Sequence, residues 1–136
     1  MIKLSEIIEA LEDVDTNMTA YFNTKTNEIL WQNGIEPEYS TYKEEDELKD
    51  EIVFMFDFTS KNDYDIMLQF IYTIDNIELK MFLISQVNGR GAFKRFRISI
   101  DTYSLTEKWY KFRDEKYKEI AIHWCEDNHI KYEKDC

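Results

Sequence analysis

A nine-residue segment near the middle of the chain concentrates positive charge and glycine in a protein that is otherwise strongly acidic. The segment is Gly89-Arg-Gly-Ala-Phe-Lys-Arg-Phe-Arg97, and it holds four basic residues and no acid. The whole chain of 136 residues has a formal net charge of -11. Residues 1–88 hold 19 acids and 6 lysines, while residues 89–136 hold 11 bases and 9 acids. The sequence therefore favours this segment as the place where an anion or an interaction partner binds.

The segment has two features that suit such binding. A helix that begins near Gly91 presents unpaired backbone N–H groups, and the neighbouring glycines let a phosphate or carboxylate approach the backbone beside Arg90. At about 100° per residue, Arg90, Lys94 and Arg97 cluster away from the apolar stripe of that helix, so we expect them to point outward. The candidate binding residues are Gly89, Arg90, Gly91, Lys94, Arg95 and Arg97.

The same bases also have a purely structural interpretation, in which they neutralise acids of the same molecule. Asp101 lies one helical turn after Arg97, although an exposed pair at this spacing contributes only a few tenths of a kcal/mol. The surroundings of Arg90 decide between the two interpretations. An exposed, unpaired guanidinium beside free backbone N–H groups indicates a ligand, whereas one bonded to internal carbonyls or acids indicates a structural role.

Other clusters of potentially reactive residues give weaker signals. Cys125 and His129 have i, i+4 spacing, but with His123 they offer three ligands that do not share one helix face, so we expect no metal site. The acidic run 44–47 lacks the spacers and the glycine of a calcium loop, and we expect a solvated surface. We find no catalytic triad context, phosphate loop or dinucleotide fingerprint. The sequence therefore leans against an enzyme and predicts no cofactor.

Composition indicates one globular domain over residues 1–136, since 43% of the residues are hydrophobic and 15% are aromatic. The longest apolar run, residues 52–56, is far shorter than the roughly 20 residues that span a bilayer. We expect neither a membrane span nor a signal peptide. Two cysteines do not form a disulfide framework, which favours the cytoplasm.

The order of the expected elements is that of an α+β fold. Ser5 starts a helix over residues 5–14, and the aromatic and branched segments 19–23 and 28–32 predict a β-hairpin. Residues 33–51 are expected to form a loop or an exposed helical turn, and residues 52–58 a third strand. We predict a small antiparallel sheet and an N-terminal helix, packed with a C-terminal cluster of about four helices.

Apolar stripes at helical spacing define that cluster. After Asn62 and Asp63 come three stripes, and Gly89 to Gly91 break the chain before the third. The last segment, residues 105–124, is helical with a possible break near Arg113 and Asp114. The stripes consist of Met67, Phe70, Ile71 and Ile74, then Ile77, Met81, Ile84 and Val87, then Ala92, Phe93, Phe96, Ile100 and Tyr103.

Three segments carry a resemblance to a known family. They are residues 89–97, then Trp109-Tyr-Lys-Phe-Arg-Asp-Glu115, then Ala121-Ile-His-Trp-Cys-Glu-Asp-Asn128, and with the opening helix and hairpin they cover nearly the whole chain. The chain resembles uncharacterised protein family 0158, a bacterial group of unknown function. It departs from the family pattern at His129, where glycine is expected, and at Arg97, where lysine is expected. The resemblance implies an organisation of the fold and no particular activity.

The leading hypothesis is a cytoplasmic binding or regulatory module whose partner is a protein. It rests on the contrast between the acidic first part of the chain and the basic edge from Gly89 to Arg97. An alternative is recognition of phosphate or nucleic acid at the helix start near Gly91, although the acidic first part repels nucleic acid. A third hypothesis is an enzyme of unrecognised class, with a pocket that pairs an acid with Arg90.

Overall fold

The protein is described by a computed structural model that covers residues 1–56 and 62–136, and it divides into two compact units. Unit 1 comprises Met1–Lys61 and Tyr117–Cys136, and unit 2 comprises Asn62–Lys116. The chain combines helices with a small three-stranded antiparallel sheet and a short two-stranded parallel sheet, so the α+β class is confirmed. That the whole chain is one domain stays a prediction.

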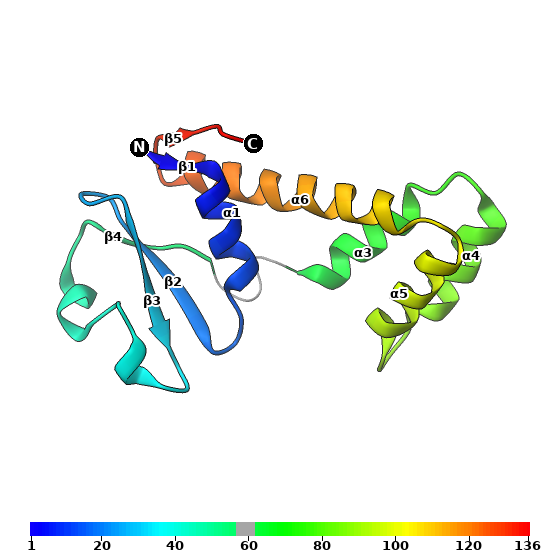
Figure 1. Cartoon of the computed structure of the whole chain (residues 1–136), viewed down its shortest axis with the longest axis horizontal. Helices are drawn as coiled ribbons and strands as arrows, with labels where there is room; N and C mark the ends of the chain where they lie inside the picture. Colours follow the sequence, from blue (N-terminus) through cyan, green and yellow to red (C-terminus); the bar gives the residue numbers. More distant parts are fainter. Residues whose placement is uncertain (57–61) are drawn as a thin grey trace. The chain divides into compact units, whose positions relative to one another are not determined.

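The elements that the sequence predicted follow one another in the expected order (Figure 1). They are β1 (Ile2–Lys3), α1 (Leu4–Asp13), β2 (Met18–Asn23), β3 (Glu28–Asn33), two 3-10 turns η1 (Pro37–Tyr39) and η2 (Glu44–Leu48), β4 (Ile52–Phe54), α3 (Asp63–Tyr72), α4 (Ile77–Gln86), α5 (Ala92–Thr102), α6 (Thr106–Asp127) and β5 (Tyr132–Glu133). The predicted third strand ends early, and its residues 57 and 58 lie outside the described residues.

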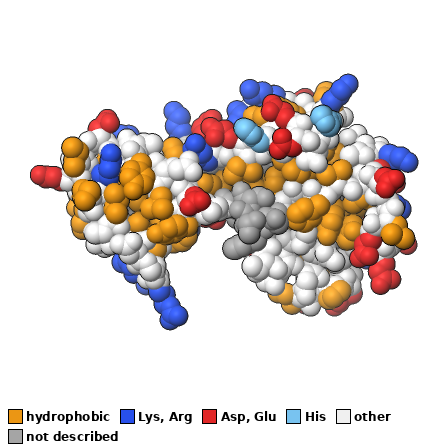
Figure 2. Space-filling view, turned by 180° about the vertical axis from the view of Figure 1, so that it is seen from behind, with side chains coloured by type: hydrophobic (Ala, Val, Ile, Leu, Met, Phe, Trp, Pro, Cys, Tyr) orange, Lys and Arg blue, Asp and Glu red, His pale blue; other side chains and the backbone are white. Residues whose placement is uncertain are grey.

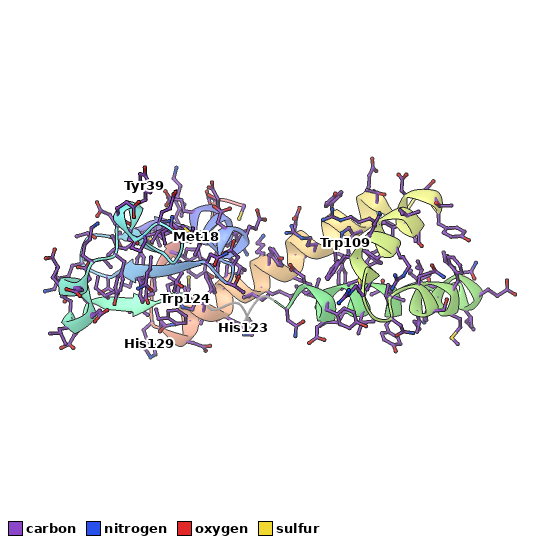
Figure 3. All side chains as sticks on the ribbon, turned by 90° about the horizontal axis from the view of Figure 1, so that it is seen from below. Met18, Tyr39, Trp109, His123, Trp124 and His129 are labelled. Atoms are coloured by element: carbon purple, nitrogen blue, oxygen red, sulfur yellow. The ribbon has the colours of Figure 1, made fainter. Side chains whose placement is uncertain are left out.

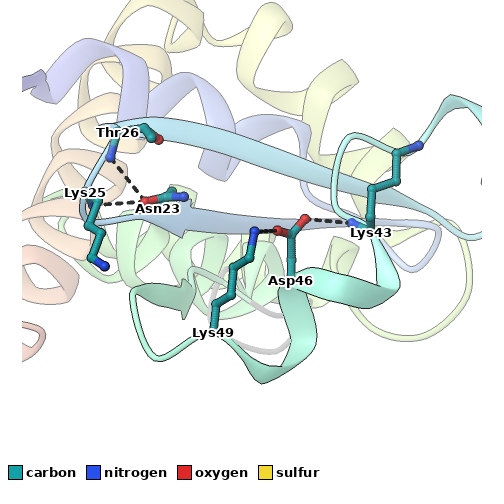
Figure 4. A network of polar contacts seen from close by, with 6 residues as sticks. All are labelled: Asn23, Lys25, Thr26, Lys43, Asp46 and Lys49. Atoms are coloured by element: carbon teal, nitrogen blue, oxygen red, sulfur yellow. Dashed lines mark hydrogen bonds and ion pairs between the residues drawn. The ribbon is translucent and has the colours of Figure 1, made fainter.

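Unit 1 is built on a three-stranded antiparallel sheet with the strand order β3-β2-β4. The predicted hairpin is confirmed, with Ala20 opposite Trp31 in the register of β2 and β3. Its turn is closed by Asn23, whose side-chain oxygen accepts hydrogen bonds from the backbone N–H groups of Lys25 and Thr26 at 2.9 and 3.1 Å (Figure 4). The buried residues of α1 recur at helical spacing and complete this core: Leu4, Ile7, Ala10 and Leu11.

Strands β1 and β5 form a short parallel pair that the sequence did not predict. It joins the two ends of the chain, with Ile2 opposite Tyr132. Asp135 strengthens the junction, because its carboxylate accepts a hydrogen bond from the Ser5 hydroxyl and another from the Ser5 backbone N–H. These two bonds, that of the hydroxyl first, hold the pKa of Asp135 below its usual value.

The acidic run before β4 forms the exposed turn that its composition predicted, with one exception. Asp46 is buried, and its carboxylate accepts a 2.9 Å hydrogen bond from the Lys43 backbone N–H and pairs with the Lys49 ammonium at 3.0 Å (Figure 4). The pKa of Asp46 is lowered, first by the bond from Lys43 and then by that from Lys49. This carboxylate therefore shapes the turn and is not available to a cation.

Unit 2 contains α3, α4, α5 and the first half of α6. Two helix starts are capped by asparagine: the Asn62 side chain accepts from the N–H of Asp65, and the Asn76 side chain accepts from that of Leu79. The core of the unit is aromatic. The ring of Phe96 contacts the rings of Phe70 and Trp109, with centroid distances of 6.2 and 4.9 Å.

The structure corrects three expectations about unit 2. Helix α6 runs unbroken from Thr106 to Asp127, so the expected break near Arg113 and Asp114 is wrong. The segment contains neither proline nor glycine, and its charged residues are good helix formers.

The second correction concerns α4. Its apolar residues lie on almost all sides of the helix, so their spacing does not define one buried face. Of the predicted stripe, Val87 is buried as expected, but Ile77 and Met81 are 73% and 61% exposed, and Leu83, which lies outside the stripe, is buried. The third correction concerns α5. Phe93 and Tyr103 were expected inside with Phe96, but they are 39% and 47% exposed. Unit 2 therefore exposes more large apolar side chains than the stripes predicted.

Candidate functional site

The basic segment forms the tight connection between α4 and α5, which lie beside each other in unit 2 (Figure 1). Two glycines make this connection, because Gly89 and Gly91 have φ values of 73° and 80°, a region that other residues rarely adopt. Gly91 directly precedes the first residue of α5, as the sequence predicted. A Cβ atom on Gly91 would also lie only 3.0 Å from a guanidinium nitrogen of Arg95.

Arg95 is bonded to the backbone of this connection. Its Nε donates to the Gln86 carbonyl at 2.6 Å, and its two terminal nitrogens donate to the carbonyls of Arg90 and Asn88 at 2.8 and 2.6 Å. Carbonyls at the end of a helix lack intrahelical partners, so the guanidinium satisfies the C-terminal end of α4 and fixes the loop that follows. Arg95 thus has a structural role, although its printed partners are backbone carbonyls and not the acids that the structural interpretation expected.

The other three bases are exposed, as the helical spacing predicted. Arg90, Lys94 and Arg97 all lie at the surface of unit 2. Within the described part of this unit, no carboxylate forms an ion pair with any of them. Asp101 stands one turn after Arg97 and is exposed, but it forms no ion pair with Arg97. The guanidinium of Arg90 is therefore exposed, as the first part of the criterion requires, but the backbone N–H of Ala92 at the helix start donates to the Gly89 carbonyl at 3.3 Å. A binding role of Arg90 stays a prediction.

Apolar side chains share the exposed face of α5 with these bases. Phe93 precedes Arg97 by one turn, and Ile98, which is 59% exposed, follows Lys94 by one turn. Figure 2 shows hydrophobic side chains gathered over this unit and basic side chains at the tip where α4 meets α5. We call Arg90, Phe93, Lys94, Arg97 and Ile98 the α5 face. It combines uncompensated positive charge with exposed apolar area, which is the composition of many binding surfaces.

Sequence reasoning missed the apolar half of this face. Ile98 lies outside the predicted stripe and attracted no attention, and Phe93 was expected to be buried. Helical geometry alone predicts the exposure of Ile98, because steps of about 100° per residue place it next to Lys94 and opposite Phe96. The exposure of Phe93 could not be read in this way, since it depends on where α6 packs along α5.

The remaining candidates do not gather into a site. Cys125 is buried, whereas His123 and His129 are exposed, and the described residues contain no group of three ligands arranged to hold a metal ion. Burial raises the pKa of Cys125 to about 11, so its thiol is protonated at neutral pH and is a poor nucleophile. His129 has a φ of 55°, which explains why glycine is the expected residue at this helix end.

No helix in the described part of the chain has both the length and the apolar character required to cross a membrane.

Comparisons with known proteins place the chain in a family without assigning it an activity. The model of an uncharacterised protein family, UPF0158, matches residues 1–135. The chain is 30% identical over 66 residues to UPF0158 protein PA5073 of Pseudomonas aeruginosa. That match covers 48% of this chain and 43% of the relative. No solved structure matches significantly. The chain therefore belongs to the uncharacterised protein family UPF0158.

Proposed function

We propose that the protein is a binding or regulatory module that recognises an acidic segment of another protein through the α5 face. The observation that carries this proposal is the exposure of Arg90, Lys94 and Arg97, none of which forms an ion pair with a described acid of unit 2. Phe93 and Ile98 add apolar area between and beside these charges. Positive charge selects and orients the partner, and burial of the apolar side chains supplies affinity.

The distribution of charge supports an acidic partner. Unit 2 holds nine bases and eight acids, a formal charge of +1, whereas the rest of the chain holds eight bases and twenty acids, a charge of -12. An acidic partner is therefore repelled by unit 1 and attracted by the α5 face. Screening over about 8 Å at physiological ionic strength confines both effects to their own surfaces, so the partner contacts unit 2.

We also infer that the protein acts in the cytoplasm. Both cysteines are free thiols, and Cys136 is exposed. An exposed free thiol is compatible with a reducing compartment, in which disulfides are rare.

Photo-crosslinking from the α5 face tests the proposed function. A photoreactive amino acid at Lys94 is expected to capture a protein partner in cells, whereas the same group at Lys111, an exposed base on α6, is not. Changing Arg90 and Arg97 together to glutamate should weaken the capture by more than about tenfold, because like charges facing each other across an interface cost several kcal/mol. Higher salt should weaken it as well.

Two outcomes would contradict this proposal. One is equal capture from Lys94 and Lys111, which would mean that the α5 face is not preferred. The other is a crosslinked product at Lys94 whose added mass is removed by nuclease, which would support nucleic-acid recognition instead. Arg95 is left unchanged in all variants, since its loss would disturb the connection itself.

A further inference from the structure

Unit 1 has an open groove of about 550 Å³ that is lined by α1, by β3 and by the turn before β3. Ile2 and Ala10 form the buried part of its lining, and each is 3% exposed. Ile29, Leu30 and Trp31 of β3 are half-buried and leave part of their apolar surface open. The groove therefore offers apolar area that a partner can cover.

The charged side chains of the groove are all acidic. Glu6, Glu9 and Asp13 lie on one face of α1, and Glu28 stands at the start of β3, whereas no lysine or arginine among the described residues lines the groove. All four acids are exposed, and none forms an ion pair with a described base. Glu6 accepts a hydrogen bond from the Lys3 backbone N–H at 3.1 Å. The groove therefore attracts a surface that is basic and apolar.

The bases of the α5 face match these acids in spacing. Lys94 and Arg97 are three residues apart on α5, and Glu6 and Glu9 are three residues apart on α1. At a rise of about 1.5 Å per residue, each pair spans roughly 4.5 Å along its helix. When the two helices run antiparallel, Lys94 lies opposite Glu9. In the same register, Arg97 lies opposite Glu6.

A third pair of opposite charges completes this alignment. Arg90 stands four residues before Lys94, in the connection that leads into α5. Asp13 stands four residues after Glu9, at the last position of α1. Because the start of one antiparallel helix lies beside the end of the other, Arg90 comes next to Asp13.

A parallel approach of the same two helices lacks this match. With Lys94 beside Glu6, the exposed Asp101 of α5 comes opposite Asp13, so two acids face each other. Like charges in such positions oppose association. The parallel register also leaves Arg90 with no acid of α1 opposite it. The spacing therefore favours the antiparallel arrangement.

We propose that the acidic partner of the α5 face is a second copy of this chain, whose groove between α1 and β3 receives the face with the two helices antiparallel. This inference rests on the proposed function, because it names the partner of the same surface. Exposed ion pairs contribute little each, so the three pairs set the register. Burial of Phe93 and Ile98 in the groove supplies affinity.

The packing of unit 2 leaves the α5 face open for this contact. The other side of α5 is occupied by α6, where Phe96 meets Trp109, labelled in Figure 3, at a centroid distance of 4.9 Å. Phe93 and Ile98 keep 39% and 59% of their surface exposed. Docking therefore requires no rearrangement of the core of unit 2.

Crosslinking between light and heavy copies of the full chain tests this inference. Equal amounts of ¹⁴N- and ¹⁵N-labelled protein are mixed, and a carbodiimide joins lysine amines to the carboxylates that they contact. A crosslink between Lys94 and Glu9 is expected, with mixed light and heavy peptides, because the contact joins two copies. Lys111, an exposed base on α6, serves as the control and should give no crosslink to Glu9.

Complementary charge reversals test the register. One variant carries Arg90→Glu and Lys94→Glu, and the other carries Glu9→Lys and Asp13→Lys. Each alone should weaken self-association by about tenfold or more in sedimentation equilibrium, because like charges then face each other. An equimolar mixture should associate again, since the intact groove of one variant receives the intact face of the other.

The matched control for the groove variant changes Glu36 and Glu38 to lysine. Both are exposed acids of unit 1 outside the groove, so the net charge changes equally while the contact is kept. Self-association should not weaken in this control.

Three results would overturn the inference. These are Lys94–Glu9 crosslinks made only of unmixed peptides, a mixture of the two variants that stays monomeric, or equal weakening by the control. Failure here is distinguishable from failure of the proposed function. Capture of a different protein from Lys94 in cells would refute the second copy as partner and keep the proposed function, whereas equal capture from Lys94 and Lys111 would refute the proposed function itself.

Discussion

Replacing Phe96 with alanine is expected to lower the free energy of unfolding of unit 2 by about 3 to 5 kcal/mol. Phe96 is 1% exposed and contacts the rings of both Phe70 and Trp109. Truncation removes apolar contact area and also leaves a cavity that three helices would have to collapse to fill. Urea denaturation followed by the Trp109 indole signal measures the loss in this unit.

Phe93→Ala is the matched control for that substitution. It removes the same ring from the same helix, but Phe93 is 39% exposed, so the loss should be about 1 kcal/mol or less. A loss that is equal for Phe93 and Phe96 would mean that α5 presents a different face to the core. The stability of unit 1, followed by Trp31 and Trp124, serves as an internal reference.

Replacing Arg95 with alanine is expected to destabilise unit 2 by about 2 to 3 kcal/mol. The guanidinium donates to the carbonyls of Gln86, Asn88 and Arg90, and hydrogen bonds from charged donors contribute about 1.5 to 3 kcal/mol each when they act alone. The sum is smaller than three separate bonds, because exposed carbonyls regain water. Arg95→Lys should recover only part of the loss, since an ammonium group cannot span three carbonyls in the plane of a fork.

Arg97→Ala provides the comparison for Arg95. It removes an identical side chain two residues further along α5, from a position that is exposed and makes no ion pair with a described acid. Its effect on the free energy of unfolding should be within about 0.5 kcal/mol of zero. Thermal unfolding of both variants measures the difference. Equal effects of the two substitutions would show that Arg95 does not hold the connection between α4 and α5.

Local sequence signals predicted much of the fold. The helical spacing of Ile7 and Leu11, the aromatic strands around the turn at Asn23, and the two glycines before α5 each act within a few residues, so a single segment contains the whole signal. The parallel pairing of Ile2 with Tyr132 could not be predicted in this way. It joins segments from the two ends of the chain, and no local pattern encodes such a pairing.

The candidate site, like the fold, was predicted only where the signal lies within a few residues. The outward direction of Arg90, Lys94 and Arg97 follows from helical geometry and was predicted. The separate role of Arg95 was not, because its partners are backbone carbonyls, which every sequence has.

The central claim is that Arg95 has a structural role, whereas Arg90 and Arg97 are proposed to bind the partner. Arg95 is bonded to the backbone, while Arg90 and Arg97 are exposed and form no ion pair with a described carboxylate of unit 2. A polar cluster on a protein surface often serves stability and binding together. In this segment we propose that the two tasks belong to different residues, Arg95 within α5 and Arg90 and Arg97 beside it.

Side-chain ¹H–¹⁵N spectroscopy of the arginines tests this claim most directly. The Nε–H group of Arg95 donates to the Gln86 carbonyl, so its signal should exchange slowly with water and show the restricted motion of the backbone. The Nε–H signals of Arg90 and Arg97 should exchange quickly and show rapid motion. A mobile, rapidly exchanging Arg95 together with a rigid, protected Arg90 would contradict the account.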